Sequence, residues 1–89
     1  MELLITELSK DKFEIIVKAD QLTKHVVSVT DQMLLNLTNN KISKEELLNF
    51  SFYFLLEREP NTLILSKFDI IVISRYFPEY ISKVENYCS

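Results

Sequence analysis

The side chains best suited to chemistry in this chain form one short charged run, Glu57-Arg58-Glu59. A pair of carboxylates can act as general acid and general base. Consecutive helical residues point about 100° apart, however, so Glu57 and Glu59 do not face each other within one helix. The run therefore favours structural ion pairs, and an enzyme that uses these acidic groups with Arg58 is the least favoured of three functional hypotheses.

Arg58 is expected to stand at the end of a helix, where a cation interacts favourably with the helix dipole. It could also pair with a carboxylate further along the chain, such as Asp69 or Glu79. The sequence predicts no catalytic residue here. The predicted structural ion-pair cluster contains six residues, which are Glu57, Arg58, Glu59, Asp69, Arg75 and Glu79.

Three other reactive side chains lack partners at a useful spacing. His25 is the only histidine and Cys88 the only cysteine, so the chain cannot supply a typical zinc site or an internal disulfide. We expect His25 at a strand edge and Cys88 as a free thiol on the C-terminal tail. Ser51 has no identifiable base and is expected to allow close helix packing. The sequence predicts neither a metal site nor a cofactor.

Composition excludes several classes of function. Glycine is absent from all 89 residues, and phosphate-binding loops, dinucleotide fingerprints and nucleophile elbows all require it. The formal net charge of −3 disfavours nucleic acid and anionic membrane surfaces as partners. No apolar stretch approaches the roughly 20 residues of a membrane span, and no signal-peptide pattern is present. We therefore expect a cytoplasmic protein with no membrane partner.

Apolar and aromatic residues crowd the second half of the chain, from Leu47 to Tyr80. So much apolar surface must be covered by the rest of the chain or by a partner. Tyrosine and phenylalanine are common at the centres of protein interfaces, although the same residues could simply close the core. The candidate interaction surface consists of four residues, which are Tyr76, Phe77, Tyr80 and Tyr87.

This apolar excess without a catalytic constellation makes a non-catalytic protein-interaction module the leading hypothesis. Such a module would act as a homo-oligomer or as a small adaptor or regulator of another protein. The second hypothesis is a nucleic-acid-binding regulator, in which residues 47–76 form a helix-turn-helix-like segment. Its helix from Ser66 to Tyr76 would be the one that reads the nucleic acid. It ranks lower because Lys67 and Arg75 alone would contact phosphates there.

The elements that must position these side chains change character near residue 30. Before it, β-prone runs and alternation of apolar and polar residues predict strands within 3–8, 13–18 and 25–30. Their links are short, so we expect an antiparallel meander. Its outer face carries Ile16 and is expected to face solvent or to pair with a second chain.

After residue 30 the apolar period becomes helical. Thr30 is expected to cap a first helix that stops at Asn39-Asn40. Ser43 and Glu46 form a capping box for a helix over 44–58, which is apolar on nearly all sides and is therefore expected to be central. Residues 61–65 suggest one helical turn.

Two more helices complete the prediction. Ser66 is expected to cap a helix with Asp69 at its third position, although the β-branched residues 70–73 would equally suit a strand. Pro78 is compatible with the start of a last helix that runs towards Asn86.

The predicted fold class is therefore α+β, with a small N-terminal antiparallel β-meander of about three strands packed against three to four C-terminal helices. We expect residues 1–89 to form a single domain, with the sheet at 1–30 and the helices at 31–89.

One block of sequence resembles a group of small uncharacterised bacterial proteins. The block covers roughly the C-terminal half and consists of SFYFLLEREP at 51–60, Ile64-Leu65, Phe68-Asp69, Val72-Ile73 and YFPEY at 76–80. The resemblance implies a bacterial origin. It assigns no activity, cofactor or functional residue.

Overall fold

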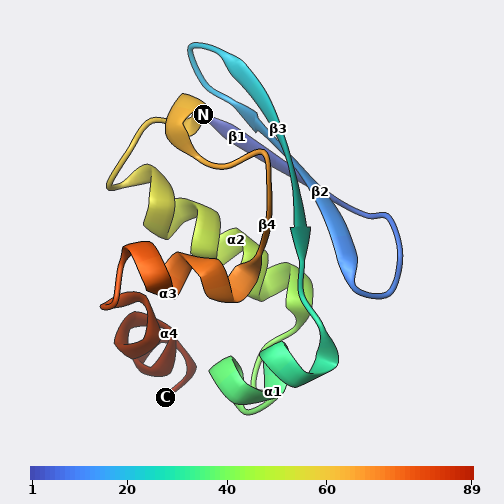
Figure 1. Ribbon diagram of the computed structural model, residues 1–89, viewed down its shortest axis with the longest axis vertical. Coiled ribbons are helices and arrows are strands. Elements are labelled where there is room, and N and C mark those ends of the chain that lie inside the picture. The colour runs from blue at the N-terminus through green and yellow to red at the C-terminus, as the bar shows by residue number, and fades with distance from the viewer.

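The computed structural model describes residues 1–89 and shows a four-stranded sheet with helices on one of its faces (Figure 1). The predicted α+β class is confirmed. The strands are β1 (Glu2–Glu7), β2 (Lys12–Lys18), β3 (Leu22–Ser28) and β4 (Lys67–Asp69); the α-helices are α1 (Asp31–Thr38), α2 (Lys44–Leu56), α3 (Ile73–Tyr76) and α4 (Tyr80–Cys88); and two 3-10 turns are η1 (Asn61–Leu63) and η2 (Ile70–Val72).

The first three strands form the expected antiparallel meander, in the order β1-β2-β3. Side chains alternate between the two faces along each strand, so one face can be apolar throughout. On β2, Phe13, Ile15 and Val17 are buried against the helices, whereas Lys12 and Lys18 at its two ends are exposed. This alternation is the reason that the helices cover only one face of the sheet.

The fourth strand corrects the sequence prediction. The expected helix from Ser66 is wrong, because residues 67–69 pair in parallel with β3, with Val27 opposite Phe68. The carbonyl oxygen of Ser66 accepts a hydrogen bond from the Val26 backbone N–H at 2.8 Å. Pairing with a distant strand therefore satisfies backbone groups that a local helix would have used. Helical structure begins only at η2 and continues in the short α3.

Two helix starts and one stop follow the prediction. The Thr30 hydroxyl accepts a hydrogen bond from the Met33 N–H at 3.1 Å, and the Ser43 hydroxyl accepts one from the Glu46 N–H at 3.1 Å. Asn39 ends α1 in the left-handed conformation, with φ at 55°. The return half of the capping box is not formed, because the Glu46 carboxylate instead accepts a hydrogen bond from the Tyr87 hydroxyl at 3.0 Å.

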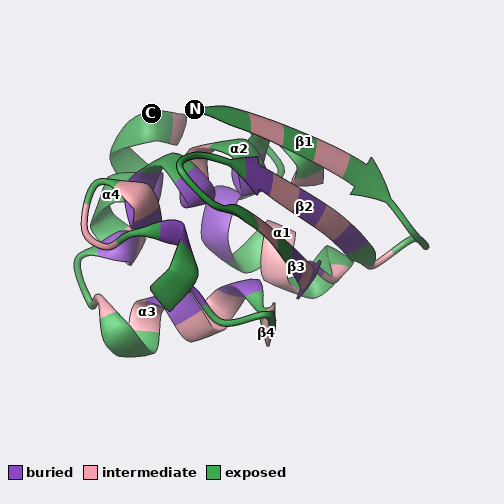
Figure 2. Ribbon diagram, turned by 90° about the horizontal axis from the view of Figure 1, so that it is seen from above, coloured by how far each residue is buried: buried purple, intermediate pink, exposed green.

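The predicted central position of α2 is confirmed. Its buried side chains include Leu48 and Phe52, and Phe52 lies 5.4 Å from the His25 ring on the sheet. On the opposite side, Phe54 contacts the ring of Tyr80 on α4, with ring centroids 5.2 Å apart. In Figure 2 the buried residues gather where the sheet and the helices face each other. The helix α4 begins at Tyr80, slightly later than predicted from Pro78.

Candidate functional site

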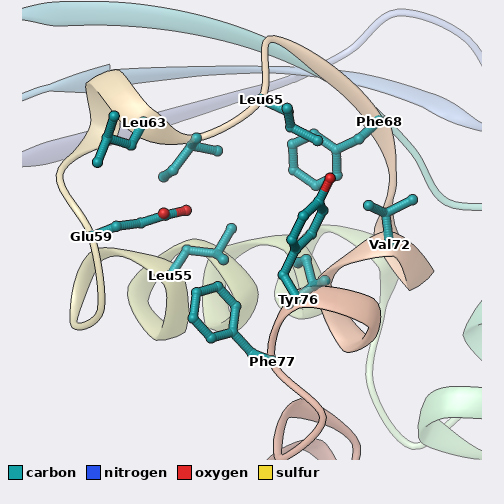
Figure 3. A pocket seen from close by; sticks show the side chains of 10 residues that line it. Leu55, Glu59, Leu63, Leu65, Phe68, Val72, Tyr76 and Phe77 are labelled. Carbon is teal, nitrogen blue, oxygen red and sulfur yellow. The ribbon is translucent and has the colours of Figure 1, made fainter.

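An apolar groove lies between the C-terminal end of α2, the segment from η1 to β4, and α3 (Figure 3). Its volume is about 270 Å³, and nine of its ten lining residues are hydrophobic. The lining residues are Leu55, Glu59, Leu63, Ile64, Leu65, Phe68, Val72, Ile73, Tyr76 and Phe77. We call this feature the apolar groove.

The rim of the apolar groove is unusually exposed for apolar side chains. Leu63 and Tyr76 are each 66% exposed, and Leu65 is 46% exposed. The floor, by contrast, includes the buried residues Leu55 and Ile73. Exposed apolar residues that surround a concave apolar floor are typical of a surface that another molecule covers.

Two polar groups interrupt the apolar lining. The Glu59 side chain extends into the apolar groove from the turn after α2, and the Tyr76 hydroxyl points towards Leu65 and Phe68 (Figure 3). Neither side chain makes an ion pair or a hydrogen bond within the chain. Both groups are therefore free to bond with a ligand.

A buried hydrogen-bond network fixes one wall of the apolar groove to the sheet. His25 on β3 is 2% exposed, and its Nδ1 donates a hydrogen bond to the carbonyl oxygen of Leu65 at 2.7 Å. Asn61 donates through Nδ2 to the Gln21 carbonyl oxygen at 2.8 Å and to the Thr23 hydroxyl at 2.9 Å. The segment from Asn61 to Leu65 is thus held at both of its ends.

The same network places a proton on Nδ1 of His25. A carbonyl oxygen can only accept, so Nδ1 carries a proton. Because the Thr23 hydroxyl oxygen accepts from Asn61, its own proton is free to bond with Nε2 of His25, 2.9 Å away. The expectation of a strand-edge histidine is wrong, since β4 and the residues before it cover β3 and place His25 in the interior.

The four residues of the predicted interaction surface do not lie together. Tyr76 and Phe77 line the apolar groove, whereas Tyr87 packs on Phe50 with ring centroids 4.7 Å apart. Tyr80 is fully buried and its hydroxyl bonds to Ser51, so it belongs to the core and not to a surface. Burial raises the pKa of the Tyr80 phenol, because it penalises the charged form.

The predicted ion-pair cluster forms only in part. Nε of Arg58 lies 3.3 Å from the Glu79 carboxylate, as expected, and a second nitrogen lies 3.8 Å from Glu57. The pKa of Glu79 is lowered by its own backbone N–H and then by Arg58. Glu59, Asp69 and Arg75 take no part in these pairs, so the six residues do not form one cluster.

The arrangement required for the nucleic-acid hypothesis is also not present. The strand β4 and the turn η2 occupy residues 67–72, and α3 spans only residues 73–76. A reading helix over 66–76 is therefore wrong. No group of three or more His, Cys, Asp or Glu side chains is arranged to hold a metal ion, and none of the helices has the length and hydropathy needed to cross a membrane.

Sequence reasoning identified Tyr76, Phe77 and Glu59 but missed most of the apolar groove. Leu63 and Leu65 stand in a segment too short to show a helical or strand period. The feature of the sequence that could have indicated these two residues is the run of three consecutive apolar residues at 63–65, between a proline turn and a serine. Such a run on a surface segment indicates contact with something outside the segment.

Comparison of the chain with protein-family models, with curated proteins and with solved structures found no match.

Proposed function

We propose that this protein is a non-catalytic interaction module, and that the apolar groove binds an apolar segment of a protein partner that also carries a basic residue. The observation that carries the proposal is the exposed apolar rim around a concave floor. Leaving Leu63, Leu65 and Tyr76 in water is unfavourable, and covering them would recover about 25 cal/mol for each Å² buried.

The size of the apolar groove favours side chains of a larger partner over a complete small ligand. Small-molecule sites generally enclose roughly 300–1,000 Å³. A volume of about 270 Å³ lies below that range and suits one or two apolar side chains. Most of the partner would then rest on the surrounding rim.

The charge of the partner follows from Glu59. Its carboxylate extends over the apolar groove without an intramolecular cation, in a chain of net charge −3. A lysine or arginine next to the apolar anchor would supply that cation and form a charge-assisted hydrogen bond. An acidic segment would be repelled.

The His25 and Asn61 network supports recognition by keeping the apolar groove formed before the partner arrives. Both side chains are buried, and their bonds fix the backbone at Leu65 and at Asn61 itself. Binding to a preformed site costs less conformational entropy than binding to a loose loop.

Selection of displayed random peptides on the full chain tests this proposal. We expect enriched peptides that combine a leucine or aromatic anchor with a lysine or arginine. Leu65→Ser should weaken their binding by about tenfold, since one apolar contact is worth about 1–3 kcal/mol. The matched control Leu22→Ser removes an equally apolar, 63% exposed side chain on β3 and should not change binding.

The charge rule is tested separately with Glu59→Lys, which should shift the selected peptides from basic to acidic. Failure to enrich any peptide, equal binding by Leu65→Ser, or an unchanged charge preference in Glu59→Lys would each contradict the proposal. Circular dichroism of every variant checks that the fold is retained.

A further inference from the structure

The outer edge of β1 has no partner in the sheet. The strand order is β1-β2-β3-β4, so β1 pairs with β2 alone. An unpaired edge is a template for another chain, and proteins usually block it with lysine, proline or a bulge. β1 contains no lysine or proline, and its register with β2 runs from Glu2 to Glu7 without a bulge. Its two charged residues, Glu2 and Glu7, stand only at its ends, so its centre is unprotected.

We propose that β1 pairs antiparallel with β1 of a second copy of this chain, with the two Leu4 residues opposite each other on a two-fold axis. In antiparallel pairs, opposite residues point to the same face of the sheet. Leu3 then lies opposite Ile5 of the second copy, and Glu2 lies opposite Thr6. No two like charges face each other.

Other two-fold registers are poorer. A two-fold axis perpendicular to the sheet leaves each side chain on the same face of the sheet. Because neighbouring residues of a strand point to opposite faces, the axis must pass through a residue that lies opposite its own copy. Centring on Ile5 would place Leu3 opposite Glu7, and centring on Leu3 would place Glu2 opposite Leu4. Both alternatives set a carboxylate of β1 against an apolar side chain of β1, and centring on Leu3 also shortens the paired segment. The side chains that lie opposite each other therefore favour the Leu4 register.

Side chains of β2 extend the apolar rows of the proposed pair on both faces of the sheet. On the outer face Leu4 pairs with Ile16, so the two copies would form one apolar row of Ile16, Leu4, Leu4 and Ile16. This row would cover Leu4, which is 38% exposed in the single chain. On the helix side, Leu3 and Ile5 already lie beside Val17 and Ile15 of β2, and the second copy would extend that apolar layer.

The space beside β1 allows this extension. Figure 2 shows β1 at the border of the sheet, without a helix beyond it. On the helix side, a shallow hollow lined by Leu3, Ile5 and residues at the start of α2 adjoins the edge. Glu45 and Glu46 also line it, so carboxylates of both copies would flank the axis. Added salt should therefore strengthen the pairing by screening them.

Sedimentation and light scattering over a micromolar to millimolar series test the inference. The wild-type chain should approach twice its mass of 10.5 kDa as concentration rises, and more readily at higher salt. Leu4→Lys and Leu4→Glu should each stay monomeric, because like charges meet on the axis. An equimolar mixture of the two variants should recover the dimer, since opposite charges then meet.

The matched control is Leu22→Lys, which alters an exposed outer-face leucine on β3, away from the edge, and should dimerise like the wild type. A monomeric wild type at millimolar concentration, or a dimeric Leu4→Lys, would overturn the inference; a mixture of the two Leu4 variants that stays monomeric would overturn the Leu4 register. In the wild type, amide exchange of residues 3–5 should slow with concentration while that of β4 does not, and no such change would also overturn it. These outcomes do not involve the apolar groove, so they are independent of the proposed function.

Discussion

At the scale of single residues, the most informative buried bond joins α2 to α4. The Ser51 hydroxyl donates to the Leu47 carbonyl oxygen at 2.6 Å, so the Tyr80 hydroxyl must be the donor to Ser51. Both side chains are completely buried. The small serine, expected from the sequence only to allow close packing, also satisfies the one polar atom of a buried tyrosine.

This direction of donation predicts unequal costs for the two ends of the bond. Ser51→Ala leaves the Tyr80 hydroxyl buried without an acceptor and should lower the free energy of unfolding by about 1–3 kcal/mol. Tyr80→Phe leaves Ser51 its bond to Leu47 and should cost about 0.5–1.5 kcal/mol. Urea unfolding measures both.

The double variant supplies the control for that pair. Because removing both partners leaves no orphaned hydroxyl, its cost should be smaller than the sum of the single costs. Ser74→Ala should cost less than Ser51→Ala, since the Ser74 hydroxyl bonds only to the Ile71 backbone. A larger cost for Tyr80→Phe than for Ser51→Ala would show that the donor has been assigned wrongly.

At the scale of elements, one lysine joins three of them. Lys44 begins α2, where a cation is unfavourable to the helix dipole. Its ammonium lies 2.8 Å from Asp31 at the start of α1 and 3.0 Å from Asp11 before β2, and it donates to the Lys10 carbonyl oxygen at 3.1 Å. Its side chain is only 13% exposed, so these contacts fix the starts of both helices against the β1–β2 turn.

The Asp31 carboxylate gives this junction a pH signature. Hydrogen bonds from Lys44 and then Lys10 lower its pKa from 3.8 to about 2. A carboxyl group whose pKa is lower in the folded state stabilises the fold at pH values above its pKa in the unfolded state. That contribution is lost as the pH falls through its pKa in the folded state. Asp31→Asn should therefore lower stability at neutral pH and flatten the loss of stability between pH 3.8 and about 2.

Urea midpoints measured across this pH range check the prediction. Asp20→Asn is the matched control, because Asp20 makes no ion pair and lies in the β2–β3 connection. Since Asp31 is exposed, added salt should reduce the difference between Asp31→Asn and the wild type. An unchanged acid slope in Asp31→Asn would mean that the junction contributes nothing to folding.

The same elements show what could be predicted from the sequence and what could not. The starts of α1 and α2 were predictable because a cap depends on hydrogen bonds three residues apart. The strand β4 was not, because Lys67–Asp69 pairs with residues about 40 positions earlier. The apolar groove was missed for the same reason: His25 reaches Leu65 across 40 residues, and no local period records that contact.

At the scale of the whole molecule, Phe52 connects the sheet, the central helix and the apolar groove. Its ring is completely buried, 5.4 Å from the His25 ring and 6.3 Å from the Phe68 ring. Phe68 in turn lines the apolar groove. The 89 residues form a single core that includes Phe52. Loss of the Phe52 ring would therefore weaken the packing of the sheet and of the helices alike.

Phe52→Ala should therefore affect folding and recognition together. Removing a buried phenylalanine costs about 3–5 kcal/mol, against a total stability of about 5–15 kcal/mol for a typical domain. We expect a large fall in the urea midpoint and faster amide exchange throughout α2. Binding of groove-selected peptides should also weaken, because Phe68 and His25 lose a shared neighbour.

The neighbouring residue, Tyr53, provides the control for Phe52→Ala. Tyr53 is on the same helix and also aromatic, but it is 47% exposed and does not line the apolar groove. Tyr53→Ala should change stability by no more than about 1 kcal/mol, and it should leave peptide binding intact. Equal effects of the two substitutions, or α2 amides that exchange as fast as those at the chain ends, would show that α2 is not the centre of this fold. The apolar groove would then lose the rigid floor that recognition requires.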